Sequence, residues 1–136
     1  MSPNARTAIL RVNAVFLMVA AAFGFVSDIR GVFFASGPVA PVIASAPHAA
    51  IGLVEAHGLA FILGILLWRA DTTRNWHLVA VAIHVLLGTA NLVFWQVFIA
   101  GDMLATGYIT TTLHWLFVAL QLAAARSAGW SLPGRS

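Results

Sequence analysis

Several polar and titratable side chains stand alone inside long apolar stretches of the sequence, where such groups are costly and often functional. His57, Asn91 and His114 fall roughly 10–14 Å from one end of their stretches at the helical rise per residue. Glu55 and Gln96 fall slightly closer to that end, which the arginine distribution assigns to the outer leaflet. Imidazole, amide and carboxyl groups at one depth predict a pocket for a small amphipathic ligand or cofactor. We call these five residues the outer group.

A second set of polar residues falls nearer the cytoplasmic ends of the same stretches. Its members are Asn13, His84 and Gln121, which we call the inner group. His84 lies seven residues before Asn91, and Gln121 lies seven after His114, so each pair shares one face of a helix. Hydrogen bonds between helices explain any single one of these residues equally well. Together they exceed what helix register needs, which favours a polar site.

Cofactor and metal chemistry can be weighed from the same residues. His57 and His114 have the equal depth that a b-type haem with two histidine ligands requires, so haem b is an alternative to an unidentified ligand. His57, His114 and Glu55 could form a two-histidine, one-carboxylate set, but no short metal-binding spacing is present. Glu55 also points about 200° away from His57 on a helix. We therefore predict no metal site.

Catalytic motifs are absent from the sequence. The chain has no cysteine, which excludes thiolate catalysis, iron–sulfur clusters and covalently attached haem. It has no GxSxG motif and no phosphate-binding glycine loop. Glu55 and His57 could exchange protons, but this does not distinguish an enzyme from a proton relay. We do not expect an enzyme.

Small residues recur every four positions in the second apolar stretch. They are Gly52, Ala56, Ala60 and Gly64. Such a stripe lets two membrane helices approach closely. It predicts a packing seam with a neighbouring helix, a second protomer or another subunit of a membrane complex. A non-catalytic accessory or oligomeric subunit is therefore the alternative to a ligand-binding protein.

The elements that must position these residues are four apolar stretches. Hydrophobic residues make up 61% of the 136 residues and charged residues only 8%, too few to cover a soluble domain. The four stretches cover residues 8–27, 49–69, 76–99 and 105–125, each long enough to cross a bilayer. The short connections between the last three predict an all-α, antiparallel, up-down-up-down bundle in one domain, 1–136. Residues 28–48, rich in proline and glycine, are expected to form an outer loop, either a lid or a passive connector.

The distribution of arginine predicts the orientation. With four spans, six of the seven arginines fall on one side of the membrane, and only Arg30, beside Asp28, falls on the other. Positively charged loops stay in the cytoplasm, so both termini are expected there, with the protein in the cytoplasmic membrane. The arginines are dispersed, which argues against nucleic-acid binding. His48 and His77 are expected at the interfaces, exposed to solvent.

Overall fold

The structure is a computed structural model that describes residues 1–128, and all regular structure in this range is helical. Six helices follow one another along the chain: α1 (Pro3–Phe34), α2 (Ala40–Ser45), α3 (Ala49–Arg69), α4 (Arg74–Val93), α5 (Trp95–Ala100) and α6 (Leu104–Ser127). Four of these, α1, α3, α4 and α6, are long and apolar enough to cross a membrane. The predicted all-helical class is therefore confirmed, as is the presence of four apolar helices that could span a membrane.

Helix α1 continues further than its apolar stretch. Ser2 caps its start, where the Ser2 Oγ accepts a hydrogen bond from the Ala5 amide, and Pro3 occupies the first turn. The helix then runs through Asp28 and ends at Phe34. Thus the segment expected as an outer loop begins inside α1 and also contains the short helix α2. Helix α2 can fold back closely because Gly31 of α1 has no side chain at the contact.

The third apolar stretch is divided in two. Helix α4 ends at Val93, and Phe94 leaves the helical conformation before α5 begins. Aromatic contacts hold α5 against α6: the ring centroids of Trp95 and Tyr108 are 4.9 Å apart. The chain then reverses at Asp102, which has a positive φ of 52°. The predicted single span over 76–99 is therefore a long helix followed by a short one.

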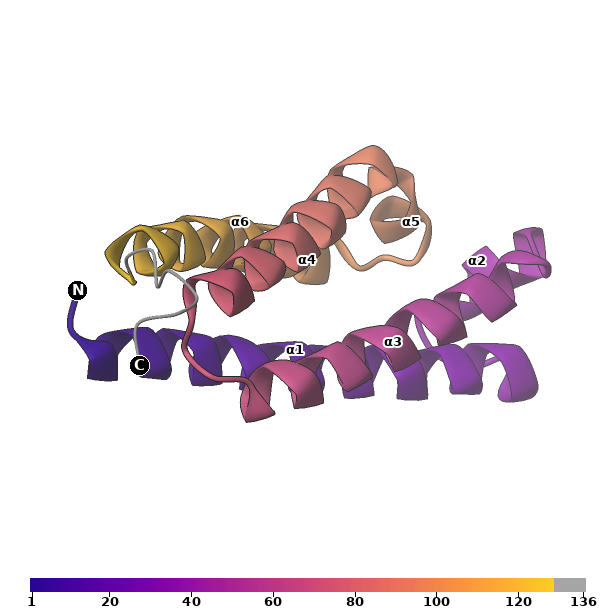
Figure 1. Cartoon of the computed structure of the whole chain (residues 1–136). Coiled ribbons are helices and arrows are strands. Elements are labelled where there is room, and N and C mark those ends of the chain that lie inside the picture. Colours follow the sequence, from indigo (N-terminus) through magenta and orange to yellow (C-terminus); the bar gives the residue numbers. More distant parts are fainter. Residues whose placement is uncertain (129–136) are drawn as a thin grey trace.

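The long helices pack as two pairs. Helix α1 packs along α3, and α4 packs along α6, so the ribbon forms two layers (Figure 1). Arg11 of α1 donates hydrogen bonds to the carbonyls of Leu67 and Ala70, 2.8 and 3.0 Å away, at the end of α3. Arg6 donates to the Ser127 carbonyl at the end of α6. The start of α1 therefore lies at the same end of the molecule as the ends of α3 and α6.

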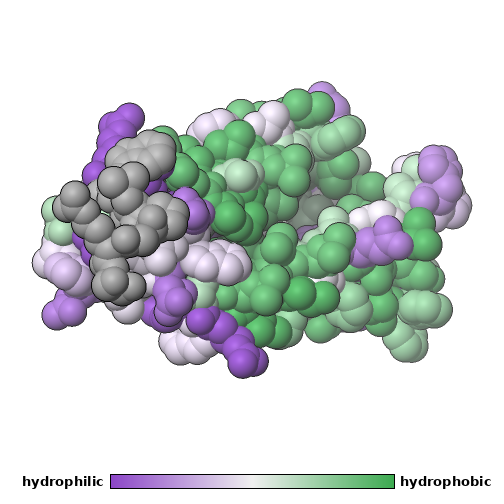
Figure 2. Space-filling view, viewed as in Figure 1, coloured by the Kyte–Doolittle hydropathy of each residue, from purple (hydrophilic) through white to green (hydrophobic). Residues whose placement is uncertain are grey.

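The surface is largely apolar. Figure 2 shows hydrophobic residues covering the middle of the visible face, with hydrophilic residues gathered mainly at the end that carries the N-terminus. The buried core is made of small and aliphatic side chains from α1, α3 and α4: Leu10, Ala14, Leu17, Ala21, Ala60, Leu67, Ala70 and Ala80. Large exposed apolar side chains on every long helix suit contact with lipid.

The predicted small-residue stripe of α3 has two different surroundings. Gly64 lies against α1, where an added Cβ would be 2.6 Å from Met18 Cγ and 3.2 Å from the Ala14 carbonyl oxygen. Ala60 is buried beside it. In contrast, a Cβ on Gly52 would have no atom within 4 Å, and Ala56 is exposed. Half of the stripe is thus a seam within the chain, and half is open.

Candidate functional site

A continuous chain of hydrogen bonds links five buried side chains from three helices. His77 Nδ1 donates to Gln121 Oε1 over 2.5 Å, and Gln121 Nε2 donates to Asn13 Oδ1 over 2.6 Å. Asn13 Nδ2 then donates to His84 Nε2 over 2.6 Å, and His84 Nδ1 lies 2.8 Å from His114 Nδ1. His77, His84, Asn13 and Gln121 are fully buried, and His114 is 7% exposed. We call these residues the central chain.

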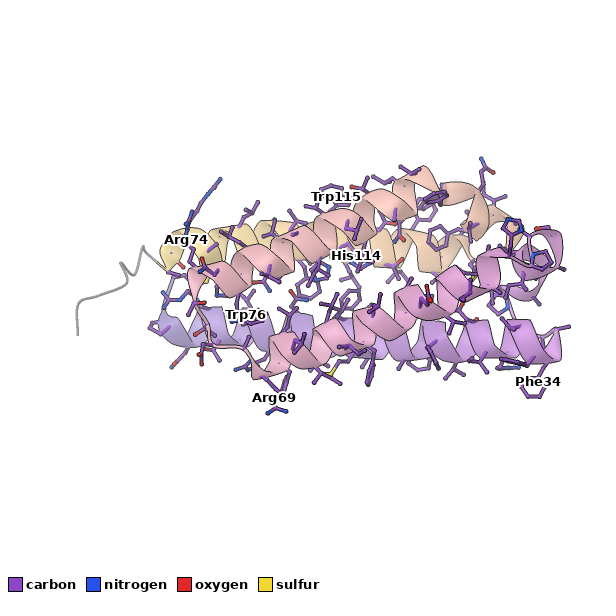
Figure 3. The ribbon with its side chains drawn as sticks, turned by 45° about the vertical axis from the view of Figure 1, so that its right-hand side comes forward. Phe34, Arg69, Arg74, Trp76, His114 and Trp115 are labelled. Atoms are coloured by element: carbon purple, nitrogen blue, oxygen red, sulfur yellow. The ribbon has the colours of Figure 1, made fainter. Side chains whose placement is uncertain are left out.

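Aromatic rings surround the middle of the central chain. Phe117 stacks on His84 with ring centroids 5.1 Å apart, and Phe16 approaches His114 edge-on at 5.7 Å. Figure 3 places His114 in the interior, where the α4–α6 layer faces the α1–α3 layer. In such an apolar environment hydrogen bonds are electrostatically stronger, and an unpaired polar group is costly. These aromatic surroundings therefore strengthen each hydrogen bond of the central chain and make the loss of any one of them costly.

A second polar site joins α1 to α3. His57 Nδ1 lies 2.6 Å from Asp28 Oδ2, and the Asp28 carboxylate is completely buried. The other carboxylate oxygen, Oδ1, has no partner among the described residues. The His57 side chain is 36% exposed, so its ring is reachable from the surface of the bundle. This pair, the Asp28–His57 dyad, combines a buried acid with a reachable imidazole.

Gly24 makes the Asp28–His57 dyad possible. It lies one helical turn before Asp28, and an added Cβ would be only 2.3 Å from His57 Cδ2 and Nε2. Glycine therefore lets the imidazole rest directly on the α1 backbone. The carboxylate orients the ring through Nδ1, and Nε2 lies beside the α1 backbone at Gly24.

The outer group does not form one site. His57 pairs with Asp28, Asn91 donates to Thr110 Oγ1 over 3.2 Å, and His114 belongs to the central chain. Glu55 and Gln96 are exposed. The inner group is brought together as a contiguous set: Asn13 donates a hydrogen bond to His84 and accepts one from Gln121.

Two participating residues were not among the predicted site residues. The expectation that His77 is solvated was wrong, because its side chain is fully buried and bonds to Gln121. Its position seven residues before His84, on the same helix face, is the signal that could have identified it. Asp28 was placed in the outer loop beside Arg30, whereas α1 carries it into the interface with α3.

A groove lies between the last third of α1, which also carries Asp28, and the segment that follows this helix. It has a volume of about 340 Å³ and is lined by Phe23, Val26, Ser27, Arg30, Gly37 and Pro38. Its walls are mostly apolar, with the cation of Arg30 among them. None of its lining residues belongs to the central chain or to the dyad, so it is separate from both polar sites.

The geometry does not fit a haem held by His57 and His114. A haem iron bound to His57 Nε2 would place the wide porphyrin ring in front of that nitrogen, which needs several ångströms of free space on every side. The α1 backbone at Gly24 lies directly against one side of Nε2. The ring of His114 is closely surrounded by His84 and Phe16. Nor do three histidine or carboxylate side chains gather as a potential metal site within residues 1–128.

Neither polar site can be compared with that of a relative, because no protein-family model, curated protein or solved structure matches the chain. We therefore infer the function from the geometry of these residues.

Proposed function

We propose that the protein is an antiparallel, up-down-up-down four-span bundle of the cytoplasmic membrane with both termini in the cytoplasm. Two contacts support this arrangement: Arg11 reaches the end of α3, and Arg6 reaches the end of α6. Both arginines, Arg69 at the end of α3 and Arg74 at the start of α4 would then lie on one side. This concentration of positive charge favours the cytoplasmic side.

Reporter fusions test the proposed orientation. A fusion at Thr73, between α3 and α4, is expected to report the cytoplasm, and a fusion at Ser36, between α1 and α2, the exterior. The physical reason is the cost of translocating arginine-rich connections. Alkaline phosphatase and fluorescent-protein activities provide the two readouts. A cytoplasmic signal at Ser36 would contradict the topology.

Within this bundle, we propose that the protein binds a small amphipathic molecule whose polar group meets His57. The observation that carries the proposal is the dyad itself: a fully buried carboxylate orients an imidazole that is 36% exposed. A buried carboxylate is costly in a membrane, and such groups tend to mark function. A role in helix packing alone would not require the imidazole to be exposed. In the proposed topology, this imidazole lies toward the outer leaflet.

The chemistry of the dyad suggests the class of ligand. When Nδ1–H donates to Asp28, Nε2 is the acceptor left on the ring, and because the α1 backbone at Gly24 closes one side of it, a small donor such as a hydroxyl group suits it. A large apolar side chain lies nearby: the Phe25 ring would be 3.8 Å from a Cβ on Gly58, the residue after His57, and it is exposed enough to contact a hydrocarbon tail. The ligand would therefore combine a hydroxyl-bearing head with an apolar tail, as a substituted hydroquinone does.

A matched pair of histidine variants tests the ligand site. We expect His57→Phe, made together with Asp28→Asn to avoid an unpaired buried charge, to weaken binding of a decyl hydroquinone roughly fivefold, because one hydrogen bond contributes about 1 kcal/mol. His48→Phe is the control, because His48 is exposed and lies outside the dyad. Titration of the probe into detergent-solubilised protein, followed by intrinsic fluorescence, measures both affinities. Equal affinities in the two variants would rule out His57 as the binding group.

A second candidate function is that of an accessory or oligomeric subunit. The specific observation is the open half of the stripe, since nothing within 4 Å covers a Cβ placed on Gly52, and Ala56 beside it is exposed. A helix from a second protomer or another subunit could approach closely there. Cross-linking in native membranes tests this candidate. Gly52→Leu should abolish a cross-linked oligomer if this face is the contact.

A further inference from the structure

The hydrogen bonds of the central chain all run in one direction. Amide oxygens only accept and amide nitrogens only donate, so Gln121 and Asn13 fix the roles of the histidines on either side. Since His84 Nε2 accepts from Asn13, a neutral His84 carries its proton on Nδ1 and donates to His114 Nδ1. His114 must then carry its own proton on Nε2. The donors therefore all point from His77 towards His114.

The central chain begins with a hydrogen-bond acceptor that has no donor. His77 Nε2 is buried and has no hydrogen-bond partner among the described residues. Such a group is costly in an apolar interior. Thr111 lies one helical turn before His114 on α6. Its Oγ1 is also buried without a hydrogen-bond partner among the described residues. One unsatisfied polar atom thus belongs to the first residue of the central chain, and another lies one helical turn from its last residue.

We propose that the central chain is a proton path that connects His77 at the start of α4 with His114 in the middle of α6. Chains of aspartate, glutamate and histidine side chains within membrane bundles act as proton relays in pumps and transporters, and three of the five residues here are histidines. This activity is independent of ligand binding at His57, because the dyad shares no hydrogen bond with the central chain.

The transfer balances with water as the proton donor at His77 and as the proton acceptor at His114. One proton binds to His77 Nε2, and the Nδ1 proton of His77 moves to Gln121 Oε1. Gln121 Nε2 passes a proton to Asn13 Oδ1, and Asn13 Nδ2 passes one to His84 Nε2. His84 Nδ1 passes its proton to His114 Nδ1, and the proton on His114 Nε2 leaves. Each N–H bond that breaks is matched by an N–H or O–H bond that forms, and one proton enters for each that leaves.

Each proton transfer changes the two amides, which must return to their starting form before the next transfer. After one transfer, Gln121 and Asn13 carry a proton on oxygen and have lost one from nitrogen, so both are imidic acids. Their rotation and return to the amide form, with re-equilibration of the imidazole tautomers, restores the starting direction. The path therefore depends on both amides, and replacing either with an apolar side chain breaks it.

Proton flux into vesicles tests the proposal. The full-length protein is reconstituted into phosphatidylcholine–phosphatidylglycerol vesicles containing a pH-sensitive dye, and a potassium gradient with valinomycin drives protons inward. The wild type should acidify the interior faster than protein-free vesicles do, and Gln121→Leu should lower the rate to that of protein-free vesicles. Gln96→Leu, the same change at an exposed position, should keep the wild-type rate. A wild-type rate equal to the protein-free rate, or no loss in Gln121→Leu, would overturn the proposal.

A measurement on the wild type covers the case in which Gln121→Leu does not fold. Nitrogen-15 NMR of labelled imidazoles distinguishes the two neutral tautomers of histidine. We expect protons on Nδ1 of His77 and His84 and on Nε2 of His114, or the complete reverse of this pattern. A mixed pattern would mean that the bonds do not share one direction, and it would overturn the proton path.

Discussion

Gly64→Leu is expected to destabilise the protein by about 3 kcal/mol, near the upper end of the usual range for overpacking a tight contact. A Cβ at this position would lie 2.6 Å from Met18 Cγ, 3.1 Å from the Met18 amide nitrogen and 3.2 Å from the Ala14 carbonyl oxygen. Met18 Cγ belongs to a flexible side chain that can move, but the other two atoms belong to the α1 backbone. Leucine therefore forces α1 and α3 apart, which also separates His57 from Asp28. Unfolding in mixed micelles with increasing sodium dodecyl sulfate measures the loss.

The same substitution at Gly52 provides a matched control on the same helix. An added side chain there would meet no atom within 4 Å. Leucine is also a better helix former than glycine by roughly 0.8 kcal/mol. We therefore expect Gly52→Leu to leave the unfolding midpoint unchanged or to raise it slightly. Equal destabilisation by the two variants would show that glycine matters through helix flexibility and not through the contact with α1.

The four spans could be predicted because their signal is local and strong. A membrane span needs only a sufficiently long apolar stretch, and each stretch contains enough residues to be recognised alone. The ends were harder to predict. Hydropathy does not show that α1 continues past Asp28 to Phe34, because a polar residue inside a helix and one after its end look alike in sequence. The break at Phe94 has no proline to announce it and coincides with the packing of Trp95 on α6.

The polar residues were found from sequence, but most of their partners were not. Counting residues along a helix gives depth in the membrane, and His57 and His114 were grouped on that basis. Depth does not say which neighbour a side chain faces, and here His57 faces α1 while His114 meets α4. The inner group was also defined by depth, and its three members do meet; His84 and Gln121 in addition lie seven residues from Asn91 and His114, on the same helix faces. His77 has the same spacing, but its place next to a polar turn suggested exposure.

Gln121→Leu is expected to destabilise the protein by about 3 kcal/mol, because it strands two buried polar groups at roughly 1–3 kcal/mol each. Those groups are His77 Nδ1, which donates to Gln121 Oε1, and Asn13 Oδ1, which accepts from Gln121 Nε2. Both residues are fully buried, so water cannot replace the lost partner. Gln96→Leu removes the same amide from an exposed site, and we expect it to leave the unfolding midpoint within about 0.5 kcal/mol of the wild type.

A double-mutant cycle that combines Gln121→Leu with Asn13→Leu shows whether the two amides of the central chain act as one unit. Asn13 bonds to both Gln121 and His84, so each single variant removes the bond between the two amides. The double variant loses that bond only once, and its cost should fall short of the sum of the single costs by about 0.5–3 kcal/mol, the range for residues in one network. Additive costs would mean that the amides contribute separately. Coupling would show that Gln121 and Asn13, which join His77 to His84, stabilise the protein as one hydrogen-bonded unit.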